Sequence, residues 1–226
     1  MILLLALIAV GTVETTTLDL RTGAVTASWN DPAPPGSLIK PFTALAYAAT
    51  HDYQYPQVSC DGHACWQPRG HGRIGIREAI AYSCNAYFAK LARDIAPADL
   101  SAVLARFGLH AMPERASSNA MFGLGDEWRV APQDLLRAYG ELAARSTEPG
   151  VADLLAGMEM SVRIGTGKAA SADMLVKTGT APCIHARHAT SDGYALALYP
   201  ARRPDHAMLV RVHGATGAGA AAYLKP

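Results

Sequence analysis

The first feature with chemical potential is a serine followed three positions later by a lysine, in Ser37-Leu38-Ile39-Lys40. Residues at i and i+3 lie on one face of a helix, so the Lys40 amine can reach the Ser37 hydroxyl. A serine hydroxyl is a weak nucleophile unless a base takes its proton, and a desolvated lysine can be that base. Alone, the pair is more typical of a serine that caps a helix and a solvated lysine.

A second group of polar residues is Ser83-Cys84-Asn85, within an otherwise helical pattern. In a short loop between helices, the side chains at i and i+2 can point into one cleft, although they share no helix face. We expect Ser83 to relay a proton between Lys40 and a leaving group, and Asn85 to hold a substrate amide. Alone, the group also fits a capped break between helices.

The third group, Lys177-Thr178-Gly179-Thr180, lies in a β-prone run. A glycine inside a strand often marks close approach by a ligand or another backbone. Lys177 and Thr178 can bind a carboxylate, and an extended substrate can pair with the strand edge. The Thr180 and Ser37 N–H groups can form an oxyanion hole. An ordinary surface turn is the alternative.

Together these groups supply what acyl transfer needs, and they resemble the S-x-x-K, S-x-N and K-T-G motifs of penicillin-binding proteins and serine β-lactamases. The surrounding sequence is more similar to the transpeptidase domain of the penicillin-binding proteins. The similarity runs from about Thr17 to the C-terminus and is carried by Pro35 to Tyr47 (PGSLIKPFTALAY), Cys60 to Leu91, Gly123-Leu124-Gly125, Val130 to Gln133, and Tyr194 to Gly217.

The resemblance implies an α+β fold of the β-lactamase/transpeptidase type, with a five-stranded antiparallel sheet flanked by helices and a helical lobe. It implies a transpeptidase or D,D-carboxypeptidase that acts on D-Ala-D-Ala-type peptidoglycan stem peptides and is acylated by β-lactams. No cofactor and no metal are expected. The implied catalytic residues are Ser37, Lys40 and Ser83, and the implied substrate-binding residues are Asn85, Lys177, Thr178, Gly179 and Thr180.

Departures from the family pattern leave other functions open. Only 94 positions separate Ser83 from Lys177, fewer than family members usually have, and Ala181 to His185 lacks an aromatic residue that often follows the lysine motif. One alternative is a serine β-lactamase, which needs a base for deacylation. Glu141 and Glu148 are the candidates for that base. The other is a sensor or binding module that β-lactams acylate once, without turnover.

Composition excludes several classes of protein. The 226 residues are 50% hydrophobic, with 20 Lys and Arg against 19 Asp and Glu, a formal net charge of +1. The hydrophobic content excludes a disordered or collagen-like chain. The balanced charge predicts no nucleic-acid partner. Four cysteines are too few for a disulfide scaffold at this length.

The hydrophobic pattern predicts helices segregated from an antiparallel sheet. A hairpin is expected over residues 15–20 and 24–29, and a hairpin of strands over 194–199 and 208–212, next to a strand over 174–180. Helices are expected over 37–49, 76–94 with a break at 83–85, 97–107, 132–145, 151–162 and 214–224.

The first 13 residues, MILLLALIAVGTV, are too few to span a bilayer but suit a signal peptide or short anchor. A buried first strand is the alternative. We expect export to the periplasm or to the outer face of the cytoplasmic membrane, with membrane association possible through this segment. A single transpeptidase-like domain is expected over residues 14–226.

Cysteine and histidine residues gather between Cys60 and His71. Cys60, Cys65 and His71 offer soft ligands for zinc, but their spacing is not a usual zinc pattern. In an exported protein we expect a Cys60–Cys65 disulfide instead. Cys84 and Cys183 are expected to remain free thiols.

Overall fold

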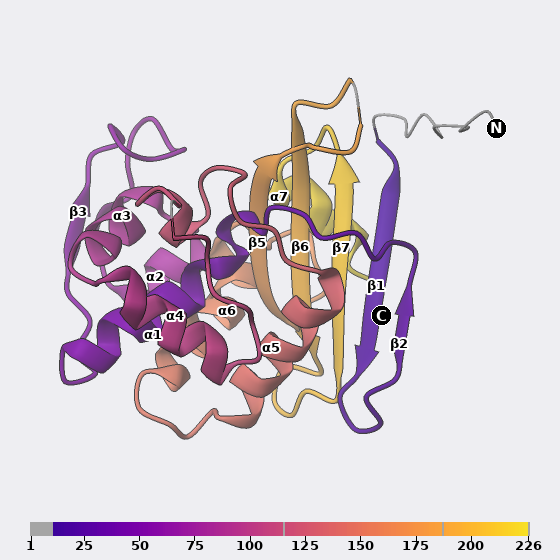
Figure 1. Cartoon of the computed structure of the whole chain (residues 1–226), viewed down its shortest axis with the longest axis horizontal. Helices are drawn as coiled ribbons and strands as arrows, with labels where there is room; N and C mark the ends of the chain where they lie inside the picture. Colours follow the sequence, from indigo (N-terminus) through magenta and orange to yellow (C-terminus); the bar gives the residue numbers. More distant parts are fainter. Residues whose placement is uncertain (1–10, 115, 187, 226) are drawn as a thin grey trace.

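The structure, a computed structural model, describes residues 11–114, 116–186 and 188–225 (Figure 1). Its centre is a five-stranded antiparallel sheet in the order β2-β1-β7-β6-β5, which confirms the expected α+β fold. A separate pair of short strands, β3 and β4, lies in the helical part. The strands are β1 (Val13–Asp19), β2 (Val25–Ala27), β3 (Val58–Cys60), β4 (Gly72–Ile74), β5 (Leu175–Pro182), β6 (Ser191–Tyr199) and β7 (His206–His213).

Both predicted hairpins are present. β1 pairs with β2, and β6 pairs with β7 from Asp192 opposite His213 to Tyr199 opposite His206. The strands β5, β6 and β7 are longer than the periodicity predicts, because ladder hydrogen bonds continue through residues of low β-propensity such as Gly193. First and last strands lie side by side, since β1 pairs with β7 along its whole length.

The helices follow the predicted order. The predicted break between residues 76 and 94 is confirmed, because α2 ends before Ser83 and α3 begins at Asn85. The expected C-terminal helix is only a short helix and a 3₁₀ turn, since glycine disfavours helix. The helices are α1 (Lys40–Thr50), α2 (Ile76–Ala81), α3 (Asn85–Arg93), α4 (Pro97–Arg106), α5 (Pro132–Ala144), α6 (Val151–Ile164) and α7 (Gly217–Ala220), with 3₁₀ turns η1 (Gly36–Ile39), η2 (Ala120–Phe122) and η3 (Ala221–Tyr223).

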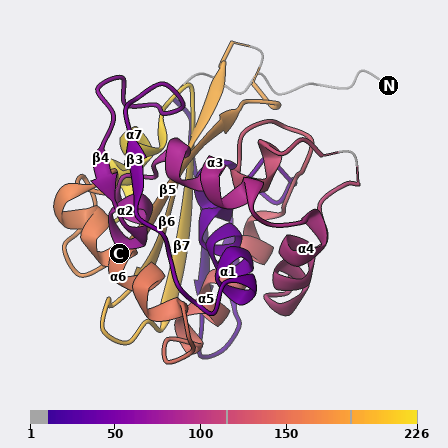
Figure 2. The same ribbon diagram turned by 90° about the vertical axis from the view of Figure 1, so that its left-hand side faces the viewer.

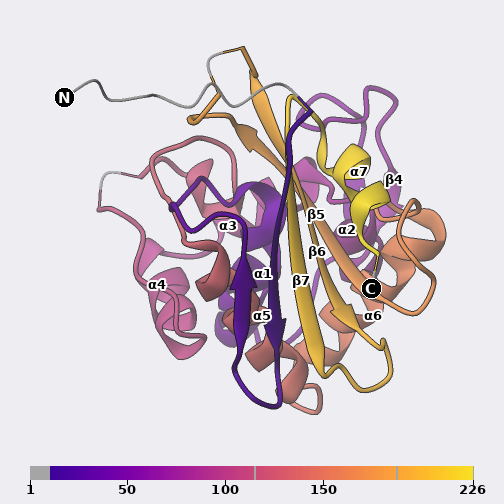
Figure 3. The ribbon, with the colours of Figure 1, turned by 90° about the vertical axis from the view of Figure 1, so that its right-hand side faces the viewer.

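Helices cover both faces of the sheet (Figure 3). Successive residues of a strand point to opposite faces. On β6, Leu196 and Leu198 belong to the core shared with the helical lobe, whereas Ala195 and Ala197 face the smaller core beneath α7 and η3. The alternation therefore builds two cores on one sheet.

Helix α1 is the centre of the helical lobe, with α3 and α4 around it (Figure 2). Every residue from Lys40 to Ala48 is buried, as expected for a helix that is apolar all round. The Phe42 ring makes edge contacts with Phe107 and Tyr139, at centroid distances of 5.3 and 5.6 Å. The turn that carries Ser37 therefore leads directly into a fully packed helix, whose first residue is Lys40.

The sheet continues almost to the start of the described chain. Val13 lies opposite Val212, and the Gly11 N–H donates to the His213 carbonyl at 2.8 Å. Residues 1–10, where most of the expected signal segment falls, lie outside the described residues. Across the part of the chain that is described, no helix has the length and apolar character needed to cross a bilayer.

Replacing Phe42 by alanine tests the role of α1 in stability. The side chain is fully buried against two aromatic rings, so Phe42→Ala should lower the free energy of unfolding by about 3–5 kcal/mol. The control is Ile164→Ala, at a side chain that is 44% exposed, which should change it by about 0.5 kcal/mol or less. Equal midpoints for the two variants in urea would contradict this packing.

Candidate active site

Ser37 lies in the 3₁₀ turn that leads into α1, with its side chain almost buried. Gly36 before it has a φ of +56°, and a Cβ there would lie 2.8 Å from the Thr180 carbonyl oxygen. A glycine is therefore required where the turn passes strand β5. The close approach brings the Ser37 and Thr180 backbones together, as the oxyanion-hole hypothesis requires.

A loop of the helical lobe supports this turn from the other side. A Cβ on Gly123 would lie 2.0 Å from the Gly36 carbonyl oxygen, so the two backbones are in direct contact. The Thr43 hydroxyl of α1 donates to the Met121 carbonyl at 2.5 Å and holds the same loop. Sequence similarity pointed to Gly123-Leu124-Gly125, but not to its place beneath the nucleophile turn.

Lys40, at the start of α1, is fully buried. Its Nζ donates to the Ser83 carbonyl at 2.9 Å and to Asn85 Oδ1 at 2.6 Å, and lies 3.5 Å from Ser83 Oγ. Burial lowers the pKa of Lys40 to about 7, although the nearby Cys84 and Cys65 oppose this shift. A large part of the amine is therefore neutral near pH 7, as a base must be.

Ser83 lies between two lysine amines. Lys177 Nζ donates to Ser83 Oγ at 2.8 Å and to the Thr178 carbonyl at 2.7 Å, and it is fully buried. Burial, and then the charge of Lys40, hold the pKa of Lys177 well below its usual value. Ser83 itself has a φ of +52°, a strained conformation for a residue with a side chain. Such strain persists where the surrounding structure imposes it, often at functional sites.

The motif residues meet at a cavity of about 430 Å³ between the helical lobe and strand β5. A larger cavity, of about 820 Å³, lies beside the β1–β2 turn and contains none of the motif residues. We place the candidate site in the smaller one, because the convergent polar groups are there. It is lined by Ser37, Trp66, Ser83, Asn85, Leu124, Thr166, Thr178, Gly179, Thr180, Thr216, Gly217 and Ala218.

The structure thus brings the predicted residues together, but Lys177 does not line the cavity. Thr178, Gly179 and Thr180 line the cavity, whereas Lys177 is buried behind them with its amine on Ser83. The residues that this motif presents to the cavity are therefore Thr178, Gly179 and Thr180, and Lys177 reaches the cavity through its hydrogen bond to Ser83.

Sequence reasoning missed two supports of these threonines. Thr166 Oγ1 lies 2.5 Å from Thr178 Oγ1, and Thr180 Oγ1 accepts a hydrogen bond from the Gly217 N–H at 2.9 Å. Thr166 lies between two glycines, Gly165 and Gly167, and nothing in this local sequence connects it to a strand residue later in the chain.

A cluster of thiols adjoins the candidate site. The sulfur atoms of Cys60, Cys65 and Cys84 and a ring nitrogen of His71 all lie within 4.8 Å of one another. All of these cysteines are free, so the expected Cys60–Cys65 disulfide is not present. The spacing suggested no usual zinc pattern because the last donor, Cys84, comes from the loop between α2 and α3.

The donor set of this cluster suits a metal ion. Three thiols and one imidazole form one of the usual ligand sets of structural zinc sites. Cys65 Sγ lies 3.5 Å and Cys60 Sγ 3.6 Å from His71 Nδ1, close to a tetrahedral edge. Burial, and then the charge of Lys40, lower the pKa of His71, which favours the neutral imidazole that binds metals.

Comparisons with known proteins agree with this geometry. A sequence model described as the penicillin binding protein transpeptidase domain matches residues 15–225. No curated protein matches the chain at a significant level.

Solved structures share the fold at low sequence identity. Pseudomonas aeruginosa PBP2, in complex with WCK 5153, is 19% identical with a TM-score of 0.78, over 94% of this chain and 69% of that one. Helicobacter pylori PBP2, solved with MreC, is 17% identical with a TM-score of 0.78, and the match covers 94% of this chain but only 58% of that one. The transpeptidase domain of Legionella pneumophila FtsI4 is 19% identical with a TM-score of 0.66, over 94% and 85% of the two chains.

The state of the cysteines can be measured directly. Denatured under chelating conditions without reductant, the chain should titrate four free thiols, because the structure holds all four cysteines reduced. Cys60→Ser should titrate one fewer. A wild-type value of two would restore the disulfide that the sequence favours.

Proposed function

Since the chain belongs to the penicillin binding protein transpeptidase family, we propose that it acylates Ser37 with D-Ala-D-Ala-type stem peptides of peptidoglycan. The family consists of penicillin-binding acyl-serine transferases, so the reaction class follows from membership. The observation that carries the residue roles is the Ser83 hydroxyl, which lies between two buried lysine amines at the cavity that Ser37 lines.

The first step is attack by Ser37 Oγ on the carbonyl carbon of the penultimate D-alanine. Lys40, one helical turn along, takes the hydroxyl proton in its neutral form. Its described hydrogen bonds go to Ser83 and Asn85, and catalytic hydrogen bonds often tighten only when substrate binds. The Ser37 and Thr180 N–H groups stabilise the oxyanion of the tetrahedral intermediate.

Collapse of the intermediate breaks the bond to the terminal D-alanine. Ser83 gives its proton to the departing amine and regains one from the Lys40 ammonium, which completes the transfer. Asn85 orients the substrate amide, and Thr178 and Thr180 bind the terminal carboxylate in the field of Lys177. An amine acceptor then gives cross-linking, whereas water gives carboxypeptidase activity.

The described carboxylates favour this reading over a β-lactamase. None of the residues that line the cavity is acidic. Glu141 pairs with Arg145 and lines the other, larger cavity, and Glu148 pairs with Arg106 and Arg145. Because no acidic residue lines the cavity in the described part of the chain, water attack on the acyl-enzyme lacks a general base of the β-lactamase type there, and the ester should be long-lived.

The proposal includes the setting of the protein. Stem peptides lie outside the cytoplasmic membrane, so we place the enzyme there, as a single transpeptidase-like domain from residue 14 onward. Of the apolar segment expected as a signal peptide or membrane anchor, residues 1–10 would supply this function, because Gly11 and Val13 already contact the sheet.

Acylation of Ser37 is the direct test of the proposal. One benzylpenicillin should add to each chain and persist for minutes or longer, and peptide mapping should place it on the segment that contains Ser37. Ser37→Ala should abolish the adduct, and Lys40→Ala should slow its formation by roughly 10²–10⁴-fold, as expected for loss of a general base. An adduct that survives Ser37→Ala would overturn the assignment, and so would its absence on folded wild type with several β-lactams.

The pH dependence of acylation tests Lys40 as the base. Because burial lowers the pKa of Lys40 to about 7, the amine loses its proton as the pH rises through 7, and the acylation rate should rise there to a plateau. Stopped-flow measurements with a chromogenic β-lactam provide the profile. Lys40→Ala should show no rise over this range; a rise that it retains would assign the titration to another group.

A further inference from the structure

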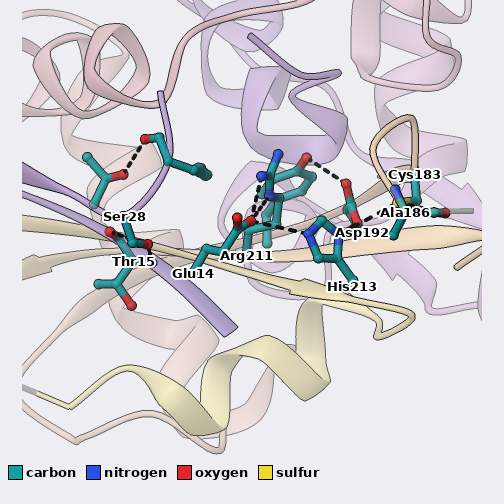
Figure 4. Close-up of polar contacts among 11 residues, drawn as sticks. Glu14, Thr15, Ser28, Cys183, Ala186, Asp192, Arg211 and His213 are labelled. Carbon is teal, nitrogen blue, oxygen red and sulfur yellow. Dashed lines mark hydrogen bonds and ion pairs between the residues drawn. The ribbon is translucent and has the colours of Figure 1, made fainter. Parts of the chain in front are cut away.

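A second cluster of metal-ligating side chains lies outside the candidate active site, at one end of the sheet (Figure 4). Cys183 directly follows β5, Asp192 lies on β6, and His213 ends β7. Asp192 and His213 are directly opposite each other in the ladder and are fully buried. Three adjacent strands thus place a sulfur, an oxygen and a nitrogen donor within 4.8 Å of one another.

The donor atoms converge on one nitrogen of the imidazole. His213 Nδ1 lies 2.6 Å from Asp192 Oδ1 and 3.6 Å from Cys183 Sγ. A carboxylate oxygen and an imidazole lone pair repel each other at this distance unless a positive centre lies between them. That centre is either a proton or a metal ion.

The other side of the imidazole faces a second carboxylate. His213 Nε2 lies 3.3 Å from Glu14 Oε2, and Arg211 holds the same oxygen with Nε and Nη2 at 2.5 Å (Figure 4). Histidine ligands usually donate their second ring N–H to a carboxylate, which fixes the tautomer and leaves the other nitrogen for the metal. Glu14 Oε2 lies near Nε2 here, but the two atoms do not have hydrogen-bond geometry, so Glu14 acts on the ring through its charge.

We propose that Cys183, Asp192 and His213 bind a zinc ion. Thiolate, imidazole and carboxylate are its usual ligands, at about 2.3, 2.0–2.1 and 2.0–2.2 Å. The 3.6 Å between Cys183 Sγ and His213 Nδ1 matches a tetrahedral edge, and the Asp192 oxygen has to move outward to open the position. Binding takes the Cys183 thiol to its thiolate, with the proton lost to solvent.

Charge balance in this buried region allows a divalent ion. Without the ion, the carboxylates of Asp192 and Glu14 face one permanent cation, Arg211, which is 2% exposed. A divalent ion with the Cys183 thiolate brings the sum to neutral, as does a proton that converts His213 to imidazolium, and a buried charge that lacks compensation is costly. His185 lies in the same loop as Cys183, and its buried Nε2 has no hydrogen-bond partner among the described residues.

The position of the ion gives it a role beside the reaction. Asp192 pairs with Ala181, the residue that follows Thr180 on β5. An ion held by Cys183, Asp192 and His213 ties the end of this strand to β6 and β7. It therefore braces the edge that carries the proposed substrate-binding threonines.

Zinc content measures the site, with the thiol cluster beside the candidate active site as the internal control. Apo-protein prepared with a chelator under reducing conditions is loaded with Zn²⁺, desalted and analysed by elemental mass spectrometry. Cys183→Ser and Asp192→Asn should each hold one zinc per chain fewer than wild type. Cys60→Ser/Cys65→Ser disrupts only the other cluster and should retain the zinc at Cys183.

Cobalt identifies the sulfur ligand and guards against a folding artefact. In the Cys60→Ser/Cys65→Ser background, Co²⁺ should give a sulfur-to-metal charge-transfer band that vanishes when Cys183→Ser is added. Thermal unfolding without metal should be the same with and without Cys183→Ser. Equal zinc content in wild type, Cys183→Ser and Asp192→Asn would overturn the proposal and leave a proton between Asp192 and His213.

Discussion

Two lysine amines buried around a single serine hydroxyl are the constraint on which the candidate site depends. Lys40 and Lys177 are both fully buried, and both approach Ser83 Oγ, at 3.5 and 2.8 Å. Two ammonium groups this close together, away from water, are unfavourable, so the protein favours the neutral form of at least one. Burial therefore favours the neutral amine, and a neutral amine can accept the serine proton.

The fold provides the rigidity that this arrangement needs. Lys40 is the first residue of a helix that is buried on every side. Lys177 lies in strand β5, which is hydrogen-bonded to β6, and Ser83 has a left-handed conformation between α2 and α3. None of these elements can move alone without exposing apolar surface or breaking ladder hydrogen bonds. The Gly36 and Gly123 backbones, which leave no room for a Cβ, fix Ser37 against the same framework.

Donor clusters flank this site on both sides. The thiols of Cys60, Cys65 and Cys84 adjoin the loop that holds Ser83, and Cys183, Asp192 and His213 adjoin the end of the strand that holds Thr180. The first cluster links the β3–β4 hairpin to the loop between α2 and α3, and the second lies where β5, β6 and β7 already pair. A metal ion in either place would stiffen the backbone next to the proposed site residues.

The sequence by itself determined the local chemistry and the order of elements. Ser37 and Lys40 are one helical turn apart whatever surrounds them, and the hydrophobic periodicity gave α4 and α5 to within about a residue. Only the tertiary structure decided how the motifs act. Lys177 was expected to meet a substrate carboxylate, but burial turns its amine onto Ser83; Thr166 supports Thr178; and Cys84 joins Cys60, Cys65 and His71 in place of a disulfide. These outcomes depend on contacts between segments distant in the chain, and on desolvation, neither of which has a signature in local spacing.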